Sequence, residues 1–436
     1  MAQKQIQDLQ LRSNFDATVN IPVDDAVQTY RCTGQQVKDF IAPQIAGPSL
    51  MGNLSDSLSY PAAIPLSNLK SMLGLLGLDF SKTDRFTPVF EKTDAETLSL
   101  KAGTSVFVNG KTISFASTTP VTMPSFSGKV GTDFAIFVCD DGEVIADENF
   151  SAPTGYDPEE AKLIGGFHYG LVGPTETVAG GSFASSGNGF HWDQPAVNLI
   201  RGINVYSIWD LKFRPACDDP RGMALVANSF WADIYLCNTN PAVNGTSKYN
   251  SDVASGTVLP KIPAAFGGDG SASYANLNWW TANEIVKGYG KRLMSNAEFC
   301  AAAFGVTESQ SIGTGAVSTT TGQALGSGSN TIAFTGRVAG YTSRWGLEQA
   351  SGNQYTWGAD ASYRYDGTQT FSWKNENGGR GQVFTEGNYG LVYVFLGGGR
   401  DGAANSGSRC SYWGSYPWVS AWSIGVRAAC DPLKLG

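Results

Sequence analysis

The stretch NYGLVYVFLGGGRDGAANSGSRCSYWGSYPWVSAWSIGVRAAC at residues 388–430 is the segment from which the fold and function of this chain are most readily inferred. It contains no Lys, Glu, Gln, Met or His. Codons ending in C or T, the set reached by randomising the adenines of an Asn codon, encode Tyr, Ser, Gly, Val, Phe, Asp, Ala and Cys but not Trp. On this interpretation Trp413, Trp418 and Trp422 are fixed framework between variable positions. The alternative is a chance gap in a Gly/Ser/aromatic segment, because the same residues dominate ordinary loops and paratopes.

The composition of the whole chain is that of a folded, loop-rich, β-leaning protein. Its 436 residues include 53 glycines, with 16% charged and 12% aromatic residues, and the length favours two or three domains. A net charge of −8 gives no attraction for a phosphate backbone, so we expect no nucleic acid partner. No apolar run approaches membrane length and no signal peptide is recognisable. We therefore expect the protein to be made in the cytoplasm and not to insert into a membrane. Seven scattered cysteines without a Cys-x-x-Cys pair predict buried thiols.

Four helices are predicted from start signals and apolar spacing. A Thr-x-x-Gln capping box predicts a helix over 33–41, and leucines between 66 and 76 predict a second one that its glycines make marginal. Two further capping boxes, Thr281 with Glu284 and Ser295 with Glu298, predict two short helices.

Two β-hairpins are predicted in the region between residues 85 and 150. One turns at Asn109-Gly110 and the other at Asp141-Gly142, and both turns lie between runs of alternating apolar residues. Asn-Gly and Asp-Gly tolerate the positive φ of tight hairpin turns. The region therefore predicts a small antiparallel β domain, which a lone hairpin could not stabilise.

Four motifs in order resemble the formylglycine-generating-enzyme branch of the C-type lectin fold. They are GKRLMSNAEFCAAA at 290–303, GLEQASGNQYTW at 346–357, LGGGR at 396–400 and IGVR at 424–427. The resemblance implies an α+β protein whose C-terminal part has a C-type lectin fold. That part would follow the small antiparallel β domain and an N-terminal attachment segment.

Within that branch, the arrangement GG…GSRxSxWxxxPWxSxxxIGVRAACD resembles the variable proteins of diversity-generating retroelements of the tropism-determinant kind. TGQQVKDFI at 33–41 is similar to the start of many phage tail-fibre proteins. The resemblance implies a virion protein made in the host cytoplasm, attached to phage tail proteins by its N-terminus and forming a homotrimer. The implied partner is a host cell-surface receptor, protein rather than glycan. The implied domains are an attachment segment at 1–45, a helix plus β domain at 46–156 and a lectin domain at 157–436, with its variable region at about 388–430.

Enzymatic activity is not expected. Formylglycine generation needs a close cysteine pair to hold copper, but Cys410 and Cys430 lie twenty residues apart. The related iron enzymes need a histidine triad, whereas only His168 and His191 exist. The motif residues Gln354 and Thr356 also depart from the enzyme pattern. This departure weakens the argument for catalysis more than the argument for the fold. We expect no cofactor and no metal ligands, although a structural calcium would leave little trace in sequence. The alternatives are a bacterial or prophage surface lectin without diversification and an oxidase of the sulfatase-modifying type.

The expected ligand surface is defined by codon reach and by the alternation of small or aromatic residues with tryptophans. It comprises Tyr393, Phe395, Gly399, Arg400, Asp401, Tyr412, Gly414, Ser415, Tyr416, Val419, Ala421 and Ser423. The residues expected to hold the fold beneath it are Gly397, Gly398, Arg409, Trp413, Pro417, Trp418, Trp422, Ile424, Gly425 and Arg427. Tyr and Trp offer large, rigid contact area at low cost in rotamer entropy, as in antibody paratopes.

Overall fold

The computed structural model describes residues 20–24, 29–33, 50–52, 62–64, 79–178, 192–312, 321, 339–363, 372–375, 380–385 and 390–433. The chain divides into two compact units, Met1–Asp79 and Phe80–Gly436. Among the described residues of both units, strands outnumber helices, and those helices are short. Within the described ranges, no helix has the length and apolar character needed to cross a membrane.

The first unit contains two antiparallel hairpins among its described residues. Strand β1 (Asn20–Asp24) pairs with β2 (Thr29–Thr33), and β3 (Leu50–Gly52) pairs with β4 (Ala62–Ile64). The helix predicted over 33–41 lies outside the described residues, apart from Thr33, which ends β2. The helix predicted between 66 and 76 also lies outside them.

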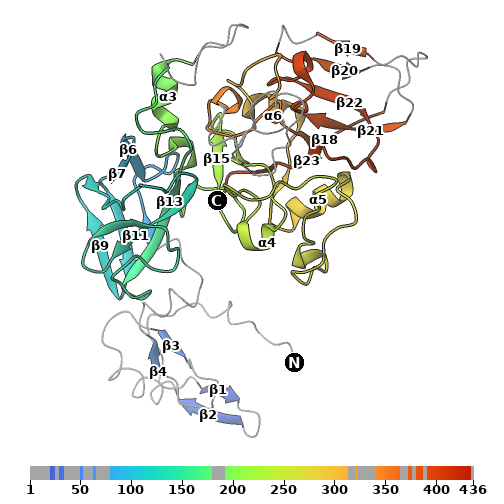
Figure 1. Cartoon of the computed structure of the whole chain (residues 1–436). Helices are drawn as coiled ribbons and strands as arrows, with labels where there is room; N and C mark the ends of the chain where they lie inside the picture. Colours follow the sequence, from blue (N-terminus) through green and yellow to red (C-terminus); the bar gives the residue numbers. More distant parts are fainter. Residues whose placement is uncertain are drawn as a thin grey trace. The chain divides into compact units, whose positions relative to one another are not determined.

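The second unit begins with short antiparallel sheets, drawn in blue and green in Figure 1. Their strands are β5 (Phe80–Ser81), β6 (Phe90–Asp94), β7 (Thr97–Leu100), β8 (Thr104–Val108), β9 (Lys111–Phe115), β10 (Thr119–Pro120), β11 (Thr132–Cys139), β12 (Val144–Asp147), β13 (Ala161–Tyr169) and β14 (Trp209–Asp210). The sheet orders are β5-β8-β9, β10-β7-β6 and β12-β11-β13-β14. Inward-facing side chains of β11 and β13, among them Phe134 and Phe167, form the core between these sheets.

Both predicted hairpins are confirmed. Val108 pairs with Lys111 across Asn109 and Gly110, whose φ angles of 46° and 75° are those a tight turn requires. The second hairpin joins β11 to β12. Strand β13 pairs with β11 along its length, so the sheet continues past residue 156. The division at residues 45 and 156 stays a prediction.

Two sheets and several short helices form the rest of the second unit (Figure 1). One sheet has the order β15-β16-β24-β17, from β15 (Met223–Val226), β16 (Phe230–Asp233), β24 (Ala428–Cys430) and β17 (Arg292–Leu293). The other has the order β19-β20-β22-β21-β18-β23, from β19 (Ser372–Lys374), β20 (Val383–Thr385), β22 (Ser411–Ser415), β21 (Leu391–Leu396), β18 (Tyr355–Tyr363) and β23 (Ile424–Gly425). The helical turns are α3 (Gln194–Ile200), η3 (Val205–Ser207), α4 (Pro241–Asn244), η4 (Ala264–Phe266), α5 (Trp279–Lys287), α6 (Asn296–Ala302), η5 (Ala339–Tyr341) and η6 (Ala403–Asn405).

The two capping boxes have different outcomes. The Ser295 side chain accepts from the Glu298 amide and opens α6, as predicted. The prediction for Thr281 is wrong, because Asn278 caps α5 and Thr281 is the third residue of the helix. The Asn278 side chain accepts from the Thr281 amide, and the Thr281 hydroxyl accepts from the Asn278 amide. Asparagine is as good an N-cap as serine, so the helix starts one turn earlier.

A buried arginine holds several segments of the second unit together. Arg427, only 2% exposed, lies between β23 and β24. Its guanidinium donates to the carbonyl oxygens of Asp233, Ile234, Glu348 and Gln349 over 2.5–3.1 Å. Because a guanidinium carries five donors and a buried carbonyl needs a partner, this residue fixes three segments at once.

Candidate functional site

The loop between β22 and β23 carries three large aromatic side chains at the surface. Tyr416 is 37% exposed, Trp418 62% and Trp422 41%. The rings of Tyr416 and Trp418 stack, with centroids 4.8 Å apart and planes inclined by 5°. The amide of Val419 donates to the carbonyl of Tyr416 at 3.1 Å, which closes a turn around the stacked pair. Large exposed rings that lie together form a ready contact surface.

The prediction that Trp418 and Trp422 are buried is therefore wrong. The loop is held by its backbone: the Pro417 carbonyl accepts from the amide of Trp279, and the Ala421 carbonyl accepts from the amide of Gly256. Between and after these anchors the Trp418 and Trp422 side chains are exposed, whereas Val419 packs against the core and the Ser420 hydroxyl accepts from the Leu277 amide. Pro417 is buried at this anchor, as predicted.

A cation lies against one of these rings. The guanidinium carbon of Arg400, in the connection from β21 to β22, is 4.0 Å from the centroid of the Trp422 ring. A cation over the face of Trp is attracted by the ring quadrupole. The Arg400 carbonyl accepts from the Ser311 hydroxyl at 2.6 Å, which fixes the backbone of this connection. We call Tyr416, Trp418, Trp422 and Arg400 the aromatic face.

A second group of rings covers strands β19, β20 and β22. Tyr412 stacks on Phe384 with centroids 4.5 Å apart and planes 1° apart, and both rings contact Trp373. All three side chains are half-buried. Burial raises the pKa of Tyr412, so it stays a neutral phenol near neutral pH. Trp373 and Phe384 precede residue 388 and therefore lie outside the segment from which the ligand residues were predicted.

The expected ligand residues divide into three groups by exposure. Asp401 and Tyr416 are exposed. The half-buried ones are Tyr393, Arg400, Tyr412, Gly414, Val419, Ala421 and Ser423. Phe395, Gly399 and Ser415 are buried, against expectation. Whether the exposed and half-buried ones contact a ligand stays a prediction.

The three buried residues have physical reasons to be inside. Phe395 packs edge-on against the fully buried ring of Trp357, 4.3 Å away. Ser415 pairs with Tyr393 in the interior of the six-stranded sheet. A β-carbon at Gly399 would lie 3.2 Å from the Tyr355 ring, so this glycine is a site of close approach.

The residues expected beneath the surface also divide. Gly397, Gly398, Pro417, Ile424, Gly425 and Arg427 are buried as expected. Trp413 is half-buried, and its indole donates to the Ser411 hydroxyl. Arg409 is exposed, so its assignment to the framework is wrong, like those of Trp418 and Trp422.

Two exposed apolar residues near the same sheet were missed. Tyr363, 74% exposed, ends β18 and pairs with Leu391, 47% exposed, at the start of β21. Alternation could not have singled out Leu391, because every residue of β21, LVYVFL, is apolar. Nothing in the codon argument selects Tyr363, which lies outside residues 388–430.

The titratable groups of the described residues give no candidate metal centre. No group of three or more His, Cys, Asp and Glu side chains comes together there in a way that could hold a metal ion. His168 is buried and contacts the Asp133 carboxylate and the Tyr235 hydroxyl, each at 2.8 Å, which suits a structural role. His191 lies outside the described residues.

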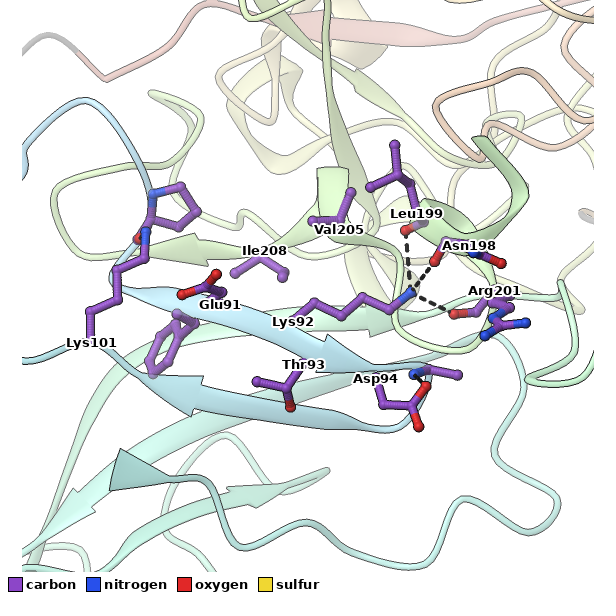
Figure 2. Close-up of a pocket in the computed structure, with 13 residues that line it drawn as sticks. Glu91, Lys92, Thr93, Asp94, Lys101, Asn198, Leu199, Arg201, Val205 and Ile208 are labelled. Atoms are coloured by element: carbon purple, nitrogen blue, oxygen red, sulfur yellow. Dashed lines mark hydrogen bonds between the residues drawn. The ribbon is translucent and has the colours of Figure 1, made fainter. Parts of the chain in front are cut away.

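A hollow of about 530 Å³ lies between β6 and the segment from α3 to η3 (Figure 2). Lys92 crosses it, and its ammonium donates to the carbonyls of Asn198, Arg201 and Ile203 over 2.7–2.8 Å. A cation at the C-terminal end of a helix satisfies the carbonyls that the helix leaves free. No expected ligand residue lines this hollow, so we assign Lys92 a structural role.

Comparison with known proteins gives three kinds of match. A family model described as "Mtd second domain" matches residues 88–193. The tail fiber receptor-binding protein of Bordetella phage BPP-1 is 44% identical over 357 residues, covering 82% of this chain and 85% of that protein. The solved Major Tropism Determinant I1 variant is 43% identical with a TM-score of 0.66, covering 82% of this chain and 86% of that one. For the U1 variant the identity is 40%, the TM-score 0.67 and the coverage 86% and 90%.

Aromatic residues and Arg, the residue types of the aromatic face, are enriched at protein interfaces. Identity of 44% over four fifths of the chain makes the relationship specific. The chain belongs to the major tropism determinant family of phage tail-fibre receptor-binding proteins. The resemblance to variable proteins of the tropism-determinant kind is confirmed.

Proposed function

We propose that this chain, as part of a phage virion, binds a receptor on the host cell through the aromatic face. The observation that carries the proposal is the exposure of Tyr416, Trp418 and Trp422, held in place by ring stacking and by Arg400. Tyr, Trp and Arg are the residues that most often dominate binding energy at protein interfaces. Stacked rings are preorganised, so little rotamer entropy is lost on contact.

The receptor is a protein rather than a glycan. The sequence lacks the Glu-Pro-Asn and Gln-Pro-Asp loops with which sugar-binding C-type lectins hold calcium. A face of rings and one guanidinium matches the composition of protein interfaces, which are enriched in aromatic residues and Arg.

The C-terminal part, residues 157–436, has a C-type lectin fold of the formylglycine-generating-enzyme type in this proposal. One contact between two of the motifs and one within a third support it. Arg427 of IGVR donates to the carbonyls of Glu348 and Gln349 in GLEQ, and within the first motif Arg292 makes two hydrogen bonds to Glu298. The proposed domains before it are residues 1–45, which attach to phage tail proteins, and residues 46–156.

Diversification of residues at about 388–430 is part of the proposal. Trp418 and Trp422 lie on the face but beyond the reach of C- or T-ending codons, so they would be constant contacts among changing neighbours. A near-copy of the coding segment rich in adenine, next to a reverse transcriptase gene, would establish this. Its absence from the phage genome would favour the runner-up, a surface lectin-like protein without diversification.

In this proposal the chain forms a homotrimer. Three weak sites on one fibre would gain avidity through effective concentration. Light scattering should give about three times the chain mass of 46.2 kDa. A monomer at micromolar concentration would contradict this. The protein has no catalytic activity and needs no resident copper or iron, and stoichiometric metal with turnover of thiol peptides would overturn that view.

The direct test of function is binding of the purified chain to host cells. Labelled protein should bind saturably and should compete with phage particles for adsorption. Cells selected for phage resistance through loss of the receptor should bind none. Equal binding to sensitive and receptor-less cells would exclude the proposed function.

A further inference from the structure

Helix α5 exposes a large ring outside residues 388–430. Trp280, the second residue of the helix, is 47% exposed, and α5 is drawn in yellow in Figure 1. The indole makes no hydrogen bond, ring contact or cation contact with the described residues. An exposed indole combines apolar area with an N–H donor, and both remain available to another molecule.

The first turn of α5 is bonded directly to the loop that carries the aromatic face. The amide of Trp279 donates to the carbonyl of Pro417 at 2.9 Å. Pro417 separates the two stacked rings along the chain, those of Tyr416 and Trp418. Trp280 follows Trp279, so its backbone lies one residue from the bond that anchors the stacked pair. The exposed indole and the stacked rings are therefore carried by adjoining backbone segments.

Further contacts hold the start of α5 against the sheet and the loop. The Trp279 ring lies 4.0 Å from the ring of Tyr393, one of the expected ligand residues. The Trp279 indole donates to the Gly358 carbonyl at 3.0 Å. Just before the helix, the Leu277 amide donates to the Ser420 hydroxyl at 2.9 Å. The backbone of this first turn is fixed before a partner arrives, which lowers the entropic cost of binding.

Helix geometry places Trp280 on the side of α5 that faces away from the core. The buried residues of the helix are Ala282, Ile285 and Val286. At 3.6 residues per turn, Trp280 lies about 120–160° around the helix axis from each of them. Its replacement therefore opens no cavity in the core, and alanine is a better helix former than tryptophan. The fold gives no reason for an indole at this position.

We propose that Trp280 is a constant receptor contact, which adjoins the aromatic face but lies outside the segment that varies. This contact deepens the proposed function and rests on it. Its occupant is the protein receptor, because the indole continues the surface that binds the receptor. Residues 388–430 select the receptor, and Trp280 adds apolar area and one N–H donor to the contact. A large rigid ring suits this role, since it supplies contact area at low cost in rotamer entropy.

Binding of the labelled full-length chain to host cells compares Trp280→Ala with Leu199→Ala. Leu199 is a matched control, because it is 40% exposed on helix α3 and lines the hollow that Lys92 crosses. We expect W280A to lose at least about fivefold in affinity, the loss of an energetically important interface residue, and L199A to lose none. Trp280→Phe keeps an aromatic ring and should retain part of the affinity. Melting temperature and the mass from light scattering should stay unchanged in all three variants.

Protection of the indole from oxidation gives a second readout, which a merely structural role would not change. Hydroxyl radicals oxidise exposed aromatic side chains, and mass spectrometry of peptides locates the oxidised residues. We expect Trp280 and Trp418 to be oxidised less in protein bound to host cells than in free protein. Phe86, 74% exposed, should be oxidised equally in both.

The proposal requires both results, so unchanged affinity of W280A or equal oxidation of Trp280 in bound and free protein would overturn it. A lower mass of the W280A assembly would also overturn it, by placing Trp280 between subunits. If W418A weakens binding and W280A does not, this contact fails while the proposed function stands. If the unchanged chain does not bind host cells, the proposed function fails and this contact fails with it.

Discussion

Arg427 and Trp418 lie nine residues apart, yet the charged residue is buried and the apolar one is exposed. The charged residue is 2% exposed and the aromatic one 62%. Arg427 is inside because four carbonyl oxygens receive its donors, and burial lowers its pKa only to about 10. Trp418 is outside because the loop backbone is anchored at Pro417. The framework uses a polar residue to organise backbone, whereas the loop keeps apolar area free for a partner.

The framework side of this comparison predicts the largest effect. Replacing Arg427 by Met would remove the guanidinium from four buried carbonyls, of which that of Ile234 keeps a hydrogen bond from the Glu348 amide. We expect a loss of about 3–5 kcal/mol in the free energy of unfolding, measured by urea denaturation, because breaking a buried polar network costs that much. The control R85M removes an exposed arginine and should change stability by less than about 0.5 kcal/mol. An equal loss of unfolding free energy in both variants would show that the buried Arg427 stabilises the fold no more than an exposed arginine does.

The loop side predicts loss of binding without loss of stability. Tyr416→Ala removes the ring that stacks on Trp418 at 4.8 Å. We expect host-cell affinity to fall by about 30-fold, the lower limit of an interface hot spot, with a melting temperature close to that of the unchanged protein. Titration of labelled protein on host cells measures the first and calorimetry the second. A Tyr416 variant that unfolds while binding normally would show that the ring is structural.

A smaller effect is expected at the framework helix α6. Burial alone would raise the pKa of Glu298, but hydrogen bonds from Arg292 and Ser295 outweigh it and lower the pKa. A carboxylate of lowered pKa stabilises the fold above its unfolded pKa of about 4.3, and this contribution disappears as pH falls through the folded pKa. Glu298→Gln should therefore lose about 1 kcal/mol at pH 7 and show a shallower decline below pH 5, in denaturation at several pH values. If the stability of the variant and that of the unchanged protein fall in parallel below pH 5, Glu298 contributes nothing to acid sensitivity.

The smallest effect concerns the cation of the aromatic face. Arg400→Gln removes the guanidinium that lies 4.0 Å from the Trp422 ring. The attraction is worth about 0.5–1 kcal/mol at an exposed site, so we expect a change of a few-fold in affinity and a shift in Trp fluorescence. Arg400→Lys should restore part of both. If the glutamine and lysine variants behave alike, charge at this position is irrelevant to the face.

Local signals in the sequence predicted local structure well. Asn109-Gly110 and the Ser295 capping box appear as expected, because turn and cap chemistry depend on a few adjacent residues. The prediction for Thr281 failed by one turn, since Asn278 is an equally good cap. Arg427 was correctly placed inside through its motif, although composition alone gives no reason to bury an arginine.

The candidate site was only partly predictable. Residue type assigned Trp418 and Trp422 to the core, whereas their exposure depends on hydrogen bonds from distant residues such as Trp279 and Gly256. Those partners come from other elements, so a reading of residues 388–430 could not reveal them. For the same reason Trp373, on a strand outside that segment, was not selected although it contacts Tyr412.

Trp418→Ala, with Phe86→Ala as its matched control, tests the central claim most directly. Phe86 is 74% exposed and lies beside Arg85, so it reproduces an exposed aromatic and arginine pair away from the aromatic face. Host-cell affinity and melting temperature are measured together for both variants. We expect W418A to melt within a few degrees of the unchanged protein and to lose at least about tenfold in affinity, while F86A changes neither. Unchanged binding by W418A, or an equal loss in F86A, would contradict the assignment of the aromatic face as the receptor contact.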